Sequence, residues 1–168
     1  RWHAGLSAKN FGSNTFYSAK YDNQFEHTFK SYTAIQAESR QGAFHLKPAI
    51  YWNHIYDRFE LFRGEPSKYP FNYHRTDVWG LNLNAYFDWT LGRTALGAEV
   101  RNEDLVSGNL GEPLANPKHI HGTGRMYDHG LNRTNIQLFL EHNIILKRLT
   151  VSPGITAVKN TQANMNME

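Results

Sequence analysis

DVWGLNLNAYFDWTL, residues 77–91, is the stretch that decides the fold class of this chain. From Trp79 to Leu91 every odd-numbered position is apolar, whereas the even-numbered positions are mostly polar or small. An alternation with a period of two is typical of a strand that has one apolar face and one polar face. Because strands of globular proteins usually have about 5–6 residues, the run is also unusually long.

Tryptophan stands at both ends of this apolar row, at Trp79 and Trp89. At about 3.3 Å per residue and a tilt of about 40°, the interval between them covers about 25 Å along a barrel axis. That is the height of the apolar band of an outer-membrane β-barrel, whose two rims carry aromatic girdles. The row therefore predicts a strand that crosses a membrane, with Trp52, Trp79 and Trp89 as membrane-interface aromatics.

The composition narrows the class of protein further. Charged residues make up 20% of the chain and the formal net charge is only +3, with no cluster of Lys and Arg, so a nucleic-acid partner is not expected. The absence of cysteine excludes disulfides and thiolate metal sites. No run approaches the roughly 18 consecutive apolar residues of a transmembrane helix. A transmembrane barrel needs no such run, because its lipid-facing and lumen-facing residues alternate.

The same period of two recurs along most of the chain. It predicts strands over residues 2–8, 25–40, 43–62, 77–91, 96–103, 132–146 and from 149 onward. Short turns near residues 41, 92 and 147 alternate with long loops, the longest being Val106–Gly130. Pro48 cannot donate a ladder hydrogen bond, which predicts a β-bulge there. The predicted fold class is all-β, an antiparallel up-and-down meander that is part of a transmembrane β-barrel.

Four phrases of the sequence resemble the barrel of TonB-dependent outer-membrane receptors from Bacteroidetes, above all the group of the cobalamin transporter. They are NFGSNTFYSAKYDNQFEHT (10–28), YDRFELFR (56–63), NYHRTDVWGLNLNAYF (72–87) and LFLEHN (138–143). The resemblance implies a barrel of about 22 strands in the bacterial outer membrane, occluded by an N-terminal plug. It also implies import of a large scarce nutrient, such as a metal complex, siderophore, haem or cobalamin, with energy delivered through TonB.

On this interpretation residues 1–168 are a single barrel segment of about seven strands, cut from a larger protein and lacking the plug. The expected partners are outer-membrane lipid, the plug and TonB of the parent protein, and a nutrient whose identity the sequence does not give. No cofactor is expected. The isolated segment is expected to self-associate, because cutting a barrel wall leaves unpaired strand edges and a bare apolar face.

The candidate ligand-binding residues lie on the long-loop side. In the loop Val106–Gly130, imidazole and phenolate groups stand close together in sequence and are chemically able to ligate a metal or haem. Another candidate pair, at the top of the strand that holds residues 77–91, suits an anionic ligand. Together the candidates are Tyr73, His74, His119, His121, Tyr127 and His129. The alternative is that they are solvated loop residues and interfacial anchors, and no metal site is predicted.

Other classes of protein remain as alternatives. A soluble lipocalin-like barrel that binds a small apolar ligand also alternates its faces, with the apolar face inward. A porin without a plug is a further possibility. Some outer-membrane enzymes use His with Asp or Ser, and Ser31, His54 and Asp57 are present here, but nothing in the sequence fixes a nucleophile–base geometry, so no enzyme is predicted.

Overall fold

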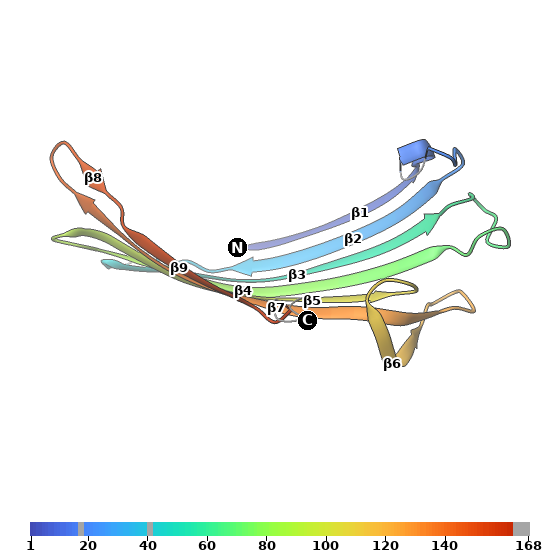
Figure 1. Cartoon of the computed structure of the whole chain (residues 1–168). Coiled ribbons are helices and arrows are strands. Elements are labelled where there is room, and N and C mark those ends of the chain that lie inside the picture. The colour runs from blue at the N-terminus through green and yellow to red at the C-terminus, as the bar shows by residue number, and fades with distance from the viewer. Residues whose placement is uncertain (17–18, 40–41, 163–168) are drawn as a thin grey trace.

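The computed structural model describes residues 1–16, 19–39 and 42–162. Within them the chain forms one curved, open antiparallel sheet, apart from a single short 3₁₀ turn, η1 (Asn14–Phe16) (Figure 1). The strands are β1 (Trp2–Gly12), β2 (Phe25–Gln36), β3 (Phe44–Glu60), β4 (Asn72–Trp89), β5 (Gly92–Ser107), β6 (Glu112–His119), β7 (Met126–Ile145), β8 (Thr150–Val151) and β9 (Gly154–Asn160). The all-β prediction is confirmed.

The strands follow one another in an up-and-down order. The path across the sheet is β1-β2-β3-β4-β5-β7-β6, and β8 and β9 also pair with β7. One edge of β7 pairs with β5. The other edge pairs with β6 at the long-loop end of β7, and with β9 and then β8 toward its short-turn end. The described strands therefore form a meander of sequence neighbours, except that β6 lies beyond β7 and not between β5 and β7.

Short turns gather at one end of the sheet, as predicted. β4 ends at Trp89 and β5 begins at Gly92, whose φ is +125°. A side chain on Gly92 would overlap the backbone carbonyl oxygen of Asn143, so only glycine fits this turn. The β7–β8 turn is closed by a 2.8 Å hydrogen bond from the Leu146 N–H to the Leu149 carbonyl. Of the predicted turn near residue 41, Gln41 lies outside the described residues.

Two predictions about proline and loops are wrong. Pro48 makes no bulge, because it pairs with Leu83 in a register that continues on both sides. Pro48 has no N–H to donate, but it lies just beyond the last residue of β2, where the ladder needs no donor. Its carbonyl accepts a 3.0 Å hydrogen bond from the Ala37 N–H. The stretch Val106–Gly130 is not a plain loop, since it contains all of β6 and the start of β7. β4 likewise begins earlier than predicted, at Asn72.

The last predicted strand is split by a second proline. β8 and β9 pair with β7 in one continuous register, and only Ser152 and Pro153 separate them. Pro153 still accepts a 2.9 Å hydrogen bond from the His142 N–H. β8 and β9 therefore act as one strand, interrupted where proline has no N–H to donate.

The open sheet buries little of its surface. The chain exposes 11909 Å², whereas a compact monomer of this size exposes about 8500 Å². The largest cluster of buried hydrophobic residues lies at the long-loop end, around Tyr73, Val106, Ile120 and Tyr127. Because the described strands form an open sheet with no closed interior, the lipocalin alternative finds no support in this geometry.

Candidate functional site

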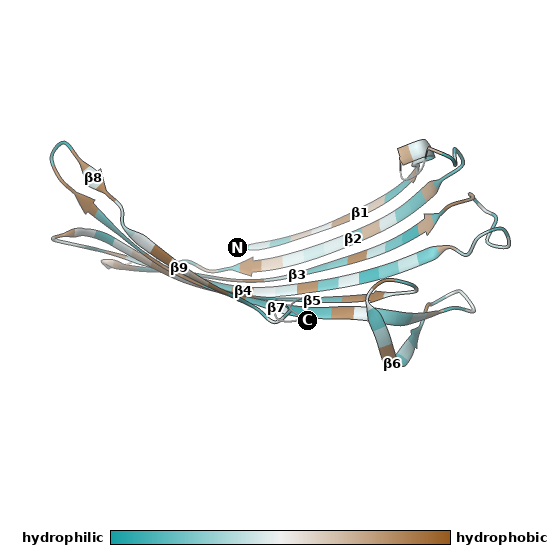
Figure 2. Cartoon of the chain, viewed as in Figure 1, coloured by the Kyte–Doolittle hydropathy of each residue, from teal (hydrophilic) through white to brown (hydrophobic). Residues whose placement is uncertain are grey.

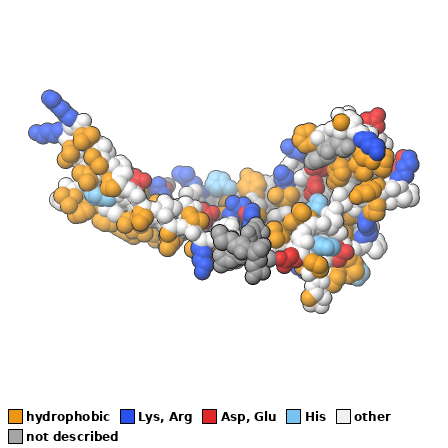
Figure 3. Space-filling model, viewed as in Figure 1, with side chains coloured by type: hydrophobic (Ala, Val, Ile, Leu, Met, Phe, Trp, Pro, Cys, Tyr) orange, Lys and Arg blue, Asp and Glu red, His pale blue; other side chains and the backbone are white. Residues whose placement is uncertain are grey.

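Side-chain alternation gives the sheet two distinct faces. The face that carries Trp79, Leu83 and Leu138 is called the apolar face here, and the opposite face, with Tyr51 and Glu99, the polar face. In Figure 3 hydrophobic side chains line the lower, convex outline of the left-hand arm, while charged and histidine side chains lie on the concave side above it.

The apolar face holds an uncovered band across the sheet. In register, Ile50, Leu81, Val100 and Ile136 form one row of the band. The next row consists of Pro48, Leu83, Ala98, Leu138 and Ala157. Leu83 is 40% and Leu138 52% exposed, although both are aliphatic. Burying such a band is favourable by about 25 cal/mol per Å², so it is suited to an apolar environment.

Tryptophan is confined to this face. All four tryptophans of the chain, Trp2, Trp52, Trp79 and Trp89, lie on it. Trp52 and Trp79 are direct cross-strand partners at the edge of the band nearest the long loops. Trp89 lies at the opposite edge, beside the short turn, where its Nε1–H donates to Thr94 at 3.0 Å. The band is therefore bordered by indole rings at both edges.

Beyond the Trp52–Trp79 pair the same face becomes polar. His54 Nδ1 lies 2.8 Å from Asp77 Oδ1, in the next apolar-face position of β3 and β4. On β5 and β7 the change occurs at the row of the tryptophan pair itself, with Asn102 and Thr134 joined by a 2.9 Å hydrogen bond. The halves of β3 and β4 nearest the long loops are mostly teal in Figure 2. On β3, β4, β5 and β7 the change from apolar to polar therefore falls within one row of the tryptophan pair.

The polar face carries a connected set of charges. The Tyr51 hydroxyl reaches across β4 and donates to Glu99 at 3.2 Å, and Glu103 pairs with both Arg101 and Arg133. Tyr51 can cross β4 because its ring lies over Gly80, where a Cβ would overlap the ring. Gly5 under Tyr32 and Gly97 under Phe139 repeat this arrangement. Glycines of this kind allow a sheet to curve toward the face they occupy.

The predicted ligand residues are divided between two environments. Tyr73 and Tyr127 are only 5% and 3% exposed, and they pack with Val106 and Ile120 where the β6 hairpin covers the sheet. Burial raises the pKa of Tyr127 to about 12, so its hydroxyl is neutral at physiological pH. The structure thus places these tyrosines in a small core, a role that sequence reasoning did not foresee.

The predicted histidines do not converge. His74 is half-buried, its Nδ1 lies 2.8 Å from Ser107 Oγ, and burial lowers its pKa. His129 Nδ1 lies 2.7 Å from Asp128 Oδ1, whereas His119 ends β6 and His121 is exposed in the loop after it. Among the described residues no group of three or more His, Asp or Glu side chains could hold a metal ion.

The residues weighed for hydrolysis are separated. His54 lies on the apolar face opposite Ser31, with Asp77 as its carboxylate partner. Asp57, three residues farther along β3, points to the polar face because side chains alternate. No described contact therefore joins Ser31, His54 and Asp57 as a nucleophile, a base and an orienting acid.

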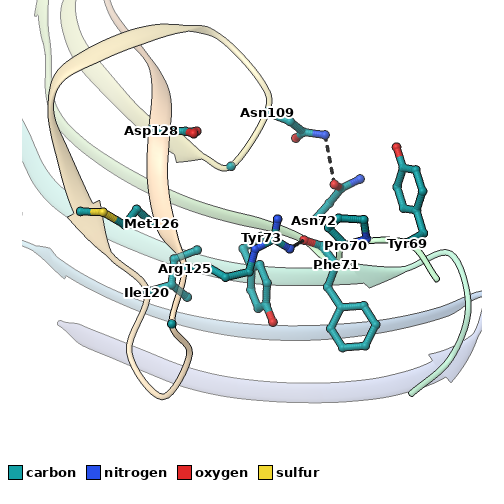
Figure 4. A pocket seen from close by; sticks show the side chains of 12 residues that line it. Tyr69, Pro70, Phe71, Asn72, Tyr73, Asn109, Ile120, Arg125, Met126 and Asp128 are labelled. Atoms are coloured by element: carbon teal, nitrogen blue, oxygen red, sulfur yellow. Dashed lines mark hydrogen bonds between the residues drawn. The ribbon is translucent and has the colours of Figure 1, made fainter. Parts of the chain in front are cut away.

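A cleft of about 500 Å³ lies at the long-loop end, and sequence reasoning did not identify it. Its walls come from the segment before and at the start of β4, the turn after β5, the loop between β6 and β7, and the start of β7 (Figure 4). Asn109 Nδ2 donates to Asn72 Oδ1 at 3.1 Å, and Arg125 Nη1 donates to the Phe71 carbonyl at 2.7 Å. Of the predicted ligand residues, Tyr73 alone lines this cleft. We call it the loop-end cleft.

The comparisons with known proteins add no family to this geometry. No family model, no curated protein and no solved structure matches the chain. No helix within the described residues is both long and apolar enough to cross a membrane.

The polar face also contains a carboxyl pair near the long loops. Thr28 Oγ1 lies 3.3 Å from Asp57 Oδ1 and 3.3 Å from Glu26 Oε1. Burial, followed by the negative charge of Glu26, raises the pKa of Asp57 to about 6, while Lys30 acts in the opposite direction. The folded chain therefore favours the protonated form of Asp57 more than the unfolded chain does.

This pair predicts a specific pH dependence of stability. Because the folded pKa of Asp57 lies above its usual value of 3.8, its protonation stabilises the fold fully below pH 3.8, and this contribution is lost as pH rises through about 6. Asp57→Asn should remove this loss, so the stability of the variant relative to the native chain should rise between pH 4 and 6. Urea unfolding in detergent at several pH values measures it, with Glu112→Gln on exposed β6 as the control. Parallel pH profiles of native chain and Asp57→Asn would contradict the assignment.

Proposed function

We propose that this chain forms part of the wall of an outer-membrane β-barrel of the TonB-dependent receptor type, which imports a scarce nutrient into a bacterial cell. The observation that carries the proposal is the apolar band between the Trp52–Trp79 pair and Trp89, with its common polar boundary on neighbouring strands. A membrane imposes such a level on every strand at once, because hydrocarbon ends at a plane.

The height of the band supports the proposal. From Trp79 to Trp89 the strand covers about 25 Å at barrel tilt, which matches the lipid-facing band of outer-membrane barrels. Indole rings prefer the membrane–water interface, where the ring is shielded and its N–H can still find a partner. The polar halves of β3 and β4 beyond Trp52 and Trp79 would then stand outside the hydrocarbon, toward the long loops.

The other face and the loops suit a transporter. In a closed barrel the polar face would meet water or a plug, where the charges around Glu103 are tolerated. Short turns at one end and long excursions at the other are the asymmetry of outer-membrane barrels. The resemblance of phrases such as NYHRTDVWGLNLNAYF favours the TonB-dependent receptors over a porin, and lipid, a plug, TonB and a nutrient are the partners that this proposal assigns.

Spin labels test which face meets lipid. The chain has no native cysteine, so a cysteine introduced at Leu83 or Leu138 takes up one label each. In lipid vesicles we expect both labels to be relaxed by oxygen, which dissolves in lipid, and shielded from a water-soluble nickel complex. Asn82→Cys and Gln137→Cys, one residue away on the polar face, are the matched controls and should show the opposite preference. The reverse pattern would mean that the apolar face is an interior, as in a soluble barrel.

A further inference from the structure

The loop-end cleft has the size and the mixture of groups of a ligand site. Its volume of about 500 Å³ falls within the roughly 300–1000 Å³ of small-molecule pockets. It lies at the long-loop ends of β4, β5 and β7, next to the buried cluster of Tyr73 and Val106. Packing of that cluster against the β6 hairpin holds the walls of the cleft in place, as a pre-formed site requires.

Aromatic and planar polar groups share the walls. Tyr69 is 46% exposed, so its ring can receive a ligand, and Figure 4 shows it at one end of the lining. Asn72 accepts from Asn109 through Oδ1, which leaves its Nδ2 as a donor. Arg125 uses Nη1 for the Phe71 carbonyl and has further N–H groups. Asp128 supplies carboxylate oxygens as acceptors.

The charges on the walls balance. Arg125 is the one cation and Asp128 the one anion of the lining, and the interaction with His129 lowers the pKa of Asp128, so that it is ionised. A polyanionic chelate would require an excess of cationic groups, which this lining lacks. A bare metal ion would require a cluster of ligating side chains, and none occurs among the described residues. A neutral ligand with many hydroxyl groups fits best.

We propose that the loop-end cleft binds a neutral saccharide. The apolar C–H face of a sugar ring stacks on the Tyr69 ring, while the planar groups of Asn72, Arg125 and Asp128 bond its hydroxyls. The inference rests on the proposed function, and it names the chemical class of the cargo first met at the long-loop end. His119 and His121 take no part in this site, since neither lines the cleft.

Titration with defined sugars tests the proposal. The full chain in lipid nanodiscs is titrated with maltotriose, cellotriose and chitotriose, and in parallel with ferric citrate and haemin, by saturation-transfer NMR or calorimetry. We expect at least one neutral trisaccharide to bind. Tyr69→Ala and Asp128→Asn should each weaken that binding at least tenfold, whereas His121→Ala, in the same hairpin but outside the lining, should leave it unchanged.

Each outcome is decisive. Binding of haemin or ferric citrate alone, binding of no saccharide, or saccharide binding that ignores both cleft variants would overturn the assignment. Tyr69 and Asp128 are exposed, so loss of fold is not expected, and circular dichroism of the same samples checks it. Spin labels at Leu83 and Leu138 report membrane embedding independently. Correct embedding without sugar binding would therefore reject the saccharide site and leave the barrel proposal intact.

Discussion

Leu83→Arg is expected to abolish stable insertion of this chain into a lipid bilayer. Leu83 lies near the middle of the interval from Trp79 to Trp89 on the apolar face, where the proposed barrel meets the centre of the membrane. An arginine on the lipid face costs about 2–4 kcal/mol at the bilayer midplane, and less near the interfaces. The folded fraction in vesicles, measured by protease resistance and by heat-dependent gel migration, should fall steeply.

The adjacent residue supplies the matched control. Asn84 lies on the polar face of the same strand, as Tyr86 does. In the proposed barrel this face lines the lumen, where charged side chains are tolerated. Asn84→Arg should therefore insert nearly as well as the native chain. A depth series strengthens the comparison, because arginine at Asp77, beyond the tryptophan pair, should cost much less than arginine at Leu83. Equal loss for Leu83→Arg and Asn84→Arg would show that the apolar face has no special relation to lipid.

The strand pattern could be predicted because it is encoded locally. The alternation from Trp79 to Leu91 assigns each side chain to a face whatever its neighbours do, since successive Cβ atoms point to opposite sides. The common polar level could not be predicted, because it depends on the register that brings Trp52 opposite Trp79. The prediction of a bulge at Pro48 was wrong for the same reason. A proline destabilises a strand only where the neighbouring strand needs its N–H for a ladder hydrogen bond, and β2 has ended at that position.

The candidate site was predicted less well than the fold. Sequence proximity suggested that His119, His121 and His129 act together, but His129 lies opposite Pro113, near the other end of β6 from His119. Tyr127 was grouped with them, although the hairpin turns it into a core with Tyr73. The lining of the loop-end cleft joins Asn72 to Asn109, which are distant in sequence and meet only because β4 pairs with β5. No periodicity or motif in the sequence predicts such a contact.

In detergent-free buffer this chain is expected to self-associate. Its exposed surface of 11909 Å² exceeds the roughly 8500 Å² of a compact monomer of this size, and large side chains of the apolar face such as Leu83 and Leu138 are among the exposed residues. The outer edge of β1 is also unpaired over its described length, which leaves backbone N–H and C=O groups free to template another strand. Sedimentation velocity should show oligomers in buffer and a single small species once detergent micelles cover the apolar face.

Tryptophan fluorescence identifies the face through which the copies associate. Because all four tryptophans lie on the apolar face, shielding from acrylamide in the oligomer reports burial of that face alone. Leu83→Lys combined with Leu138→Lys should weaken the association, since each places a charge in the band, whereas Asn82→Lys with Gln137→Lys on the polar face should not. Edge pairing alone would give oligomers whose tryptophans stay quenchable. A monodisperse monomer with fully quenchable tryptophans would mean that water can cover this band without cost, and the membrane proposal would lose the observation that carries it.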